Sequence, residues 1–485
     1  MGLFDIFKKK KKETAASAPG VIDTMSQADA ITEAASKAAE AKAEEEMDEL
    51  TRIALEAGGH TAELEKSESE MTPEELIKKG YVAIESDDNA TAIRCFKAAM
   101  DQGSLEGKVH VARCYETGRG VSKDEPHAFK LYRDAAMAGY MPVLSNLGNC
   151  YINGIGTPKD EAEGYATFMK GAEAGDAICM ANVANCLMQG VGVEKNEEEG
   201  LKWFDKASEA GNAEAEFQLG MTYLQVPEYR EKAQEGLEHV RKAAENGVID
   251  AILVMAQIHD EGGPQKNMDE CIKWLTLGAE KGDKHAQCRL GQIYMYGVGG
   301  VERNPQMGYN YLIFSAQQNH IPAIYILAEL NIVYANGNPQ AVQQGMAQLS
   351  QCIKESYPPA FMLMGQCCLE GRGVAKDHDQ AVKFFKLAAD NGIMNAVLLL
   401  AKLYSGEIEE AHFEGVNPEE AKHWLGIAAQ AGHPIALCDL AVMTLQDENA
   451  SEEDKAKAAD SLRQAAQAGY TPALQKMTEL GIGMS

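Results

Sequence analysis

Four short glycine turns that end in a lysine are the first feature of the sequence that could do chemistry. One runs from Gly118 to Lys123 as GRGVSK, and related turns begin at Gly154, Gly190 and Gly371. A glycine-rich loop with a lysine can hold phosphate when it follows a strand and ends in Gly-Lys-Ser or Gly-Lys-Thr. These turns follow predicted helices, lack that ending and recur along the chain. We therefore interpret them as structural turns.

No other pattern in the sequence predicts catalysis or metal binding. The eleven histidines and eleven cysteines form neither a paired Cys/His ligand spacing nor the HExxH motif of zinc enzymes. The sequence offers no convincing Ser-His-Asp arrangement either. We therefore expect no catalytic, metal-ligating or cofactor-binding residue, and we expect a protein that is not an enzyme.

The sequence repeats a unit that we predict to be a pair of helices. Amide and basic side chains recur on the first helix of each pair, and they form the candidate partner-binding site. Pairs three residues apart share one helix face. Asparagine and glutamine can both donate to and accept from an extended peptide backbone, so this column predicts a concave groove that holds a protein segment. The alternative is that the amides bond neighbouring helices. The residues are His110, Arg113, Asn146, Asn149, Asn182, Asn185, Gln218, Gln257, Arg289, Gln292 and Gln366.

The facing positions nearer the C-terminal end carry a different set of side chains. They are Leu363, Leu399, Lys402, Val442 and Leu445. This change predicts a polar groove in the N-terminal half of the chain and an apolar groove beyond it.

A fixed period explains why these side chains recur. Each unit closes with a glycine, and the first four gaps between closing glycines are each 36 residues. The longer gap between Gly282 and Gly392 has room for three units that end near Asn319 and Ser356. A period of this length predicts a solenoid of stacked units. The closing glycines are Gly103, Gly139, Gly175, Gly211, Gly247, Gly282, Gly392, Gly432 and Gly469.

The unit from Met141 to Gly175 shows the physics of one repeat. Apolar residues recur at helical spacing in its first half, and Gly148 lies among them although glycine costs about 1 kcal/mol against alanine inside a helix. Only a small residue there lets a second helix approach closely. Gly154 and Gly156 then end the first helix, and Asp160 begins the second as its N-cap.

Four of the repeated sequence segments resemble a known protein family. The segments LGNCYINGIGTPKD, VANCLMQGVGVEKN, LGQIYMYGVGGVERN and MGQCCLEGRGVAKD resemble the Sel-one-like repeat, an α/α repeat related to tetratricopeptide units. The resemblance covers about residues 105–470. It implies an all-α fold, a right-handed α/α superhelical solenoid of about ten helix-pair repeats, that scaffolds protein assemblies. It does not identify a partner.

The order of these features predicts five parts of the chain. The N-terminal parts form a flexible tail, since residues 13–71 are rich in Ala, Glu and Lys and almost free of aromatic residues. Such a composition buries little and behaves as a linker or a solvated helix. The parts are an apolar and polybasic tip at 1–12, the linker at 13–71, a tetratricopeptide-like capping helix pair at 72–104, the repeats at 105–470, and a C-terminal capping helix and tail at 471–485.

The N-terminal tip carries a candidate membrane contact. Its aromatic residues precede a run of lysines, and the residues concerned are Phe4, Phe7, Lys8, Lys9 and Lys10. Apolar side chains beside a polybasic block can bind an anionic lipid surface weakly. The alternative is a tail that docks on another protein or has no specific partner.

The net charge and the cysteines limit the classes of function and the cellular location that the sequence allows. The net charge of −28 argues against nucleic-acid binding and favours solubility or basic partners. No apolar run is long enough to span a bilayer, and the N-terminus shows no secretory signal pattern. We therefore expect reduced cysteines and a cytoplasmic location.

The sequence favours a non-enzymatic scaffold or adaptor that binds a protein or peptide segment in the concave groove of an α-solenoid. One alternative is a secreted or envelope-associated repeat protein with hydrolase or carbohydrate-binding activity. Cysteine-rich secreted repeats of this kind should pair cysteines within each unit, and only Cys179 and Cys186 resemble such a pair. Another alternative is a membrane-proximal adaptor that uses residues 1–12.

Overall fold

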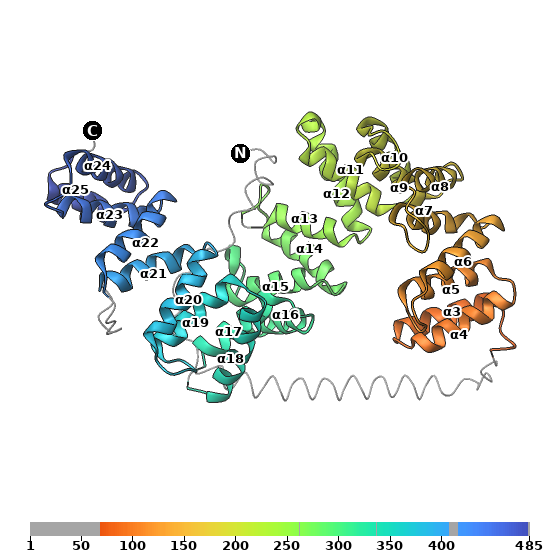
Figure 1. Cartoon of the computed structure of the whole chain (residues 1–485), viewed down its shortest axis with the longest axis horizontal. Coiled ribbons are helices and arrows are strands. Elements are labelled where there is room, and N and C mark those ends of the chain that lie inside the picture. The colour runs from red at the N-terminus through yellow and green to blue at the C-terminus, as the bar shows by residue number, and fades with distance from the viewer. Residues whose placement is uncertain (1–67, 261, 336, 407–415, 484–485) are drawn as a thin grey trace. The chain divides into compact units, whose positions relative to one another are not determined.

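Paired helices make up the part of the chain that the structure, a computed structural model, describes: residues 68–260, 262–335, 337–406 and 416–483. Within these residues 23 α-helices follow one another with no strand between them (Figure 1). They form eleven consecutive pairs and a last helix without a partner. The prediction of an all-α solenoid of helix pairs is confirmed. Contacts divide the described chain into two units, with the boundary along the sequence between Lys281 and Gly282.

The first unit holds six pairs, and each helix packs on the next along the chain. Short 3-10 helices precede α7 and join α11 to α12, at Met141–Val143 and Pro227–Lys232. The α-helices are α3 (Pro73–Glu85), α4 (Asn89–Asp101), α5 (Leu105–Thr117), α6 (Glu125–Met137), α7 (Leu144–Asn153), α8 (Glu161–Glu173), α9 (Ala177–Gln189), α10 (Glu197–Glu209), α11 (Ala213–Gln225), α12 (Ala233–Glu245), α13 (Ile249–His259) and α14 (Met268–Glu280).

The second unit holds five pairs and the last helix. A 3-10 turn at Val298–Gly300 follows its first helix. The α-helices are α15 (Lys284–Tyr296), α16 (Pro305–Gln317), α17 (Ile321–Val333), α18 (Pro339–Lys354), α19 (Pro358–Glu370), α20 (His378–Asp390), α21 (Met394–Ser405), α22 (Pro418–Gln430), α23 (Pro434–Gln446), α24 (Glu452–Gln467) and α25 (Thr471–Leu480).

Side-chain caps begin the helices where the sequence places them. Thr72 and Glu75 form a capping box, with the Thr72 amide donating to Glu75 Oε2 at 2.8 Å. Asp160 accepts from the amide of Glu163 at 3.0 Å, as the repeat pattern predicts. Each such cap stabilises its helix by about 1 kcal/mol. Equivalent caps start other second helices at Asp124, Asn196, Asn267, Asn304, Asp377 and Asn417.

The two glycines of the repeat turn have different tasks. Gly154 ends α7 in the left-handed region, with φ at 71°. Gly156 has a similar φ of 68°, but a Cβ there would lie 2.1 Å from the carbonyl oxygen of Glu125 in the preceding pair. The second glycine therefore lets one repeat approach the backbone of the repeat before it, a contact that the sequence pattern alone does not reveal.

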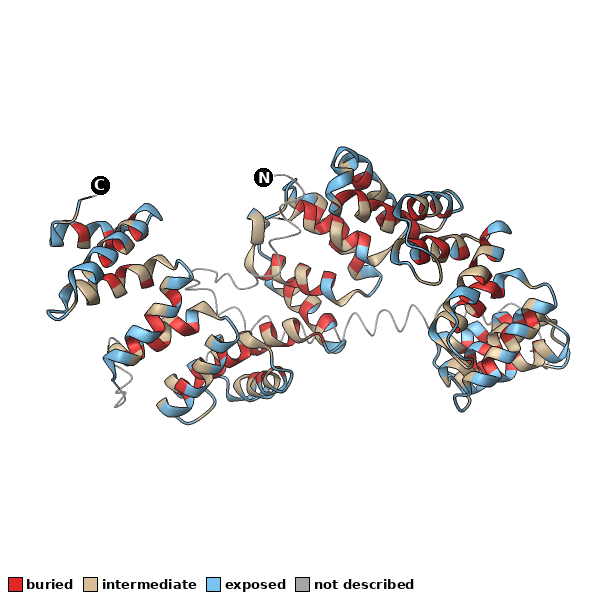
Figure 2. Ribbon diagram, turned by 45° about the horizontal axis from the view of Figure 1, so that its top comes forward, coloured by how far each residue is buried: buried red, intermediate tan, exposed pale blue. Residues whose placement is uncertain are grey.

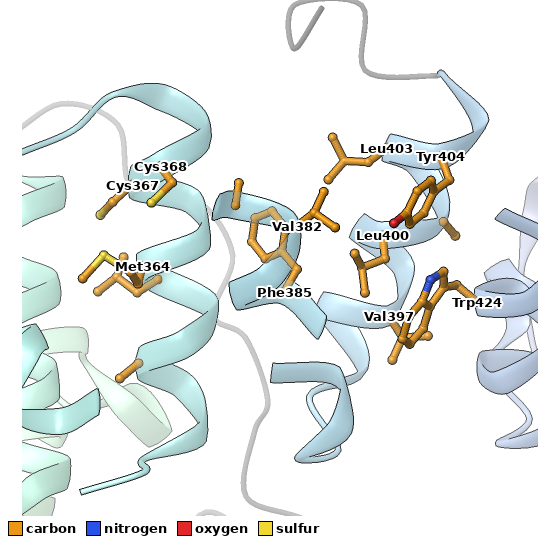
Figure 3. Packing of buried hydrophobic residues seen from close by; sticks show 14 of the residues in the cluster. Met364, Cys367, Cys368, Val382, Phe385, Val397, Leu400, Leu403, Tyr404 and Trp424 are labelled. Atoms are coloured by element: carbon orange, nitrogen blue, oxygen red, sulfur yellow. The ribbon is translucent and has the colours of Figure 1, made fainter. Parts of the chain in front are cut away.

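Small residues inside the first helices let the second helices pack closely. A Cβ on Gly148 would lie 2.4 Å from the Phe168 ring, and one on Gly365 would lie 2.5 Å from the Phe385 ring. Figure 2 shows buried residues along the facing sides of the helices. In the second unit these include Phe385, Leu400 and Trp424 (Figure 3). At these two positions an aromatic ring of the partner helix occupies the space that a larger side chain would need. This explains the predicted requirement for a small residue.

All eleven cysteines lie in the described residues, and all are buried and free of disulfides. Cys114, Cys150, Cys186 and Cys367 share one repeat position and are buried between helices. Burial raises the pKa of Cys150 to about 12 and that of Cys186 to about 11. The thiols therefore act as small apolar groups in the core.

Two units end without the usual glycine, at the residues that the period predicts. Asn319 and Ser356 take positive φ angles of 55° and 54°. Left-handed backbone is uncommon outside glycine, and asparagine tolerates it better than most residues. The repeat geometry therefore holds at these two positions in spite of the sequence change.

The predicted tip at 1–12 and most of the linker at 13–71 lie outside the described residues. The last residues of that linker contact the first helix pair. Glu68 accepts from Arg94 Nε at 2.9 Å and from Lys79 Nζ at 3.1 Å, and these contacts, that of Arg94 first, lower the pKa of Glu68 to about 2. Among the described helices, none has the length and apolar character to cross a membrane.

Candidate functional site

The first helices of the pairs approach one another in both units. Neighbouring first helices contact each other directly at three places, α7 with α9, α17 with α19 and α23 with α25. No two second helices in the described chain approach as closely. At these three places the first helices therefore lie on the inner side of the local curvature, where a bound segment would meet neighbouring repeats.

One position on this inner side has the same register in every repeat, directly after the small residue of the first helix. We call the residues at this position the inner column. Each is exposed or partly buried, although it lies on a packed helix. In the first unit they are Arg113, Asn149, Asn185, Met221 and Gln257, and in the second unit Gln292, Glu329, Gln366, Lys402 and Val442.

Four asparagines on two neighbouring helices form the clearest part of the predicted site. Asn146 and Asn149 lie on α7, and Asn182 and Asn185 lie on α9. Asn149 and Asn185 are exposed, and the other two are partly buried. In the described chain, none of the four side-chain amides makes a hydrogen bond. They do not bond the neighbouring helices, and their donors and acceptors remain available to a partner.

His110 lies at the N-terminal end of the column but is held within the fold. Its Nε2 lies 3.0 Å from the Tyr81 hydroxyl, and its ring stacks on Phe96 at a centroid distance of 4.8 Å. Its side chain is 12% exposed, and burial lowers its pKa. Arg113, one turn further along α5, is exposed. Of these two predicted contacts, Arg113 therefore offers the partner far more surface.

The remaining predicted residues of the first unit lie singly on their helices. Gln218 on α11 is partly buried, and its amide donates to Glu214 Oε1 one turn earlier at 3.1 Å. Gln257 on α13 is also partly buried. Neither residue shares its face with a second predicted residue of the same helix.

Arg289 and Gln292 form a pair in the second unit. Arg289 Nη1 donates to Gln292 Oε1 at 3.2 Å on α15. Gln366 is exposed on α19. Leu363, predicted to line an apolar groove, is instead 3% exposed and belongs to the core. A side chain three residues before the inner column turns toward the partner helix in this repeat, so the predicted apolar lining is wrong at that residue.

Glu329 and Met221 are the two residues of the inner column that the sequence pattern did not predict as site residues, and Glu329 carries a charge. Glu329 stands on α17 at the position that asparagine or glutamine occupies in most other repeats. Burial raises its pKa. The repeat register could have identified it, because aligning α17 with α7 places Glu329 opposite Asn149.

A second buried carboxylate, Glu216, is fully paired. His239 Nδ1 and Lys242 Nζ each lie 2.8 Å from its oxygens, and Ser208 donates to it as well. Burial favours the neutral acid, but the hydrogen bonds from Lys242, Ser208 and His239 prevail and lower the pKa of Glu216. These contacts join α10, α11 and α12, so the cluster ties helices together.

The lysines of three of the four glycine turns are engaged by carboxylates of the helix that follows. Each pairs with a glutamate two residues further along, at an Nζ to Oε1 distance of 2.6 to 2.8 Å. A negative charge at a helix N-terminus also favours the helix dipole. The turns therefore brace the second helices. The pairs are Lys123 with Glu125, Lys159 with Glu161, and Lys195 with Glu197.

A family model of the Sel1 repeat matches more than half of the chain. The match comprises eight segments that follow the helix pairs from α5 to α22, with a gap over α17 and α18. The segments are residues 106–140, 143–176, 177–212, 213–248, 249–283, 284–320, 359–393 and 401–433.

Individual similar proteins cover the chain to different extents. An uncharacterized protein of Neisseria meningitidis serogroup B is 27% identical over 32% of this chain and 31% of its own length. The chain spans less than a third of the length of the curated relatives it matches. A protective antigen of uropathogenic Escherichia coli with an SLR fold is 22% identical, with a TM-score of 0.43, over 84% of this chain and 94% of that one. A Sel1 repeat protein from Oxalobacter formigenes is 25% identical, with a TM-score of 0.42, over 50% of this chain and 99% of that one.

Proposed function

Because the chain belongs to the Sel1 repeat family, we propose that it is a non-enzymatic scaffold or adaptor that binds a protein or peptide segment along its first helices. Sel1 repeat proteins are typically protein-interaction scaffolds and are generally not catalytic. The inner column recurs in the same register in every repeat and yet varies in chemistry from one repeat to the next. A binding surface needs both properties, a fixed spacing and side chains that differ.

The four unbonded asparagine amides of α7 and α9 carry the proposal. Asn146 and Asn182 are partly buried, where an amide without a partner costs free energy. A peptide backbone supplies both the donor and the acceptor that each of the four amides lacks. Asn149 and Asn185 occupy equivalent positions on helices in contact. They could therefore engage an extended segment at two points one repeat apart.

The secreted alternative, with hydrolase or carbohydrate-binding activity, gains no support from the cysteines. That interpretation needs cysteine pairs within the repeats. Cys179 and Cys186, the nearest approach to such a pair in the sequence, are buried as separate thiols.

The test compares partner capture by three proteins from a lysate of the native cell, with bound proteins quantified by mass spectrometry. One is the wild type, and one has Asn146, Asn149, Asn182 and Asn185 all changed to alanine. The control changes four exposed residues of the second helices α8 and α10 to alanine, without altering net charge. They are Lys170, Glu173, Lys202 and Glu209.

We expect the asparagine variant to lose those partners that the wild type and the control both retain. Circular dichroism should show unchanged helix content in all three proteins, because the four amides make no hydrogen bond within the fold. Equal partner recovery by the two variants would contradict binding along α7 and α9.

A further inference from the structure

Glu329 is a carboxylate that the fold withdraws from water without giving it a partner. It is partly buried on the inner face of α17. In the described chain, its side chain forms no hydrogen bond and no ion pair. Withdrawing a charged carboxylate from water is costly unless another group compensates for the lost hydration. The pKa of Glu329 rises through burial alone, and no neighbouring cation opposes that rise.

Three tyrosines from consecutive first helices lie near enough to this carboxylate to feel its charge. Tyr325 lies one turn before Glu329 on α17, Tyr296 is the last residue of α15, and Tyr357 is the N-cap of α19. Each interacts electrostatically with Glu329. The rings of Tyr325 and Tyr357 have their centroids 5.4 Å apart at an angle of 58°, and all three tyrosines are partly buried.

This arrangement has the chemistry of a site for an organic cation. Aromatic faces attract a cation through their quadrupole, and a carboxylate pairs with it through charge-assisted hydrogen bonds. An anion would meet the charge of Glu329. A metal ion would find one carboxylate only, and the described chain holds no group of three His, Cys, Asp or Glu side chains that could bind one.

The position of Glu329 connects this arrangement to the partner-binding face. It occupies the inner column between Gln292 and Gln366, both of which are uncharged. A segment that runs along the first helices of the second unit would place one of its side chains against Glu329. The net charge of −28 for the whole chain also draws basic segments toward the protein.

We propose that Glu329, Tyr296, Tyr325 and Tyr357 form a cage that receives an arginine or lysine side chain of the bound segment. This inference rests on the proposed function, because it identifies one chemical requirement of the partner. Arginine fits better than lysine, since its planar guanidinium stacks on tyrosine rings and can make two parallel hydrogen bonds to one carboxylate.

The experiment titrates small probes into the full chain and follows them by ligand-observed saturation-transfer NMR. The probes are N-acetyl-arginine amide, N-acetyl-lysine amide and N-acetyl-citrulline amide, of which the citrulline compound has nearly the shape of arginine without its charge. The proteins are wild type, Glu329→Gln, Tyr325→Phe and Tyr325→Leu. The matched control is Glu355→Gln, which removes an exposed carboxylate at the end of α18.

The wild type, Glu355→Gln and Tyr325→Phe should bind the arginine amide with similar affinity, the lysine amide more weakly, and the citrulline amide not measurably. Glu329→Gln should weaken arginine binding at least about tenfold, which corresponds to about 1.4 kcal/mol, and Tyr325→Leu should weaken it as well. Glu329→Gln keeps the side-chain shape and removes an unpaired charge, so its fold should survive. Equal binding of arginine and citrulline amides, or unchanged arginine binding by Glu329→Gln, would overturn the cage.

The outcome separates this inference from the proposed function. The variant with four asparagines replaced should bind the arginine amide like wild type, because α7 and α9 contribute nothing to the cage. If that variant also captured every partner, the proposal for α7 and α9 would fail while the cation site remained established. If the asparagine variant lost its partners while Glu329→Gln bound arginine normally, the cage would fail and the scaffold would stand.

Discussion

Replacing Gly156 by alanine should separate two repeats that pack on each other. The backbone of Gly156 has a φ of 68°, which costs an L-residue about 1–2 kcal/mol. The new Cβ would lie 2.1 Å from the carbonyl oxygen of Glu125 and 2.4 Å from its carbonyl carbon. Both are backbone atoms, so no side chain can rotate away and the two pairs must shift. Overpacking of this kind costs about 1–3 kcal/mol, and the sum is about 2–5 kcal/mol.

Two neighbouring glycines provide matched controls, Gly154 in the same repeat and Gly139 at the end of the repeat before it. Gly154 has a φ of 71°, and the nearest atom to its Cβ would be 3.4 Å away. Gly139 has a φ of 87°, and nothing lies within 4 Å of its Cβ. Alanine at either position should therefore lower the stability only by the cost of the left-handed backbone, about 1–2 kcal/mol. The difference between Gly156→Ala and these controls measures the packing of one repeat on the next.

Hydrogen exchange followed by mass spectrometry is the appropriate assay, because a solenoid opens locally and its stability is a sum of repeat and interface terms. Each 1.4 kcal/mol should speed exchange about tenfold where exchange reports the opening equilibrium. Gly156→Ala should speed exchange in both α6 and α8, whereas Gly154→Ala should act on its own pair. If the two variants changed exchange in α6 equally, close approach to Glu125 would not be the reason for the second glycine.

Further expected outcomes concern the core, the thiols and one histidine. Phe385→Ala should lower the free energy of unfolding of the second unit by about 3–5 kcal/mol, since Phe385 is 0% exposed. As a control, Leu387→Ala changes an exposed residue of the same helix and should change this free energy by less than about 0.5 kcal/mol. Equal melting curves for the two variants would contradict this packing. Ellman titration should detect few thiols in the native protein and eleven in denaturant, because all eleven cysteines are buried and free; several fast thiols in the native protein would refute that burial. Burial lowers the pKa of His320 from 6.5 to about 4, so His320 binds a proton less tightly in the folded state than in the unfolded state. The free energy of unfolding should therefore fall by up to about 3 kcal/mol as the pH drops from 6.5 to 4. Ser315 Oγ donates to the Lys284 carbonyl at 2.7 Å and accepts from His320 Nδ1 at 2.9 Å. His320→Asn should therefore keep a hydrogen-bond donor and remove this part of the pH dependence of stability. If chemical denaturation showed the same loss of stability at low pH for this variant as for the wild type, His320 would not be its cause.

The sequence by itself determined the features that depend on nearby residues. The period, the helix caps at Thr72 and Asp160, and the small residue at Gly148 follow from local backbone chemistry, which is the same wherever the repeat occurs. The positions of Asn319 and Ser356 followed from counting. The asparagines at 149 and 185 could be placed on one face because helical spacing fixes the direction of each side chain.

Only the tertiary structure decided the features that depend on which helices meet. Gly156 faces Glu125 because two repeats stack, and no local pattern shows that contact. His110 is held by Tyr81 and Phe96 from the preceding pair, which reduces its value as a partner contact. Glu329 looks like an ordinary polar residue in the sequence. Its burial among tyrosines from three helices makes it distinctive, because the cost of an unpaired charge depends on the water that neighbouring elements exclude.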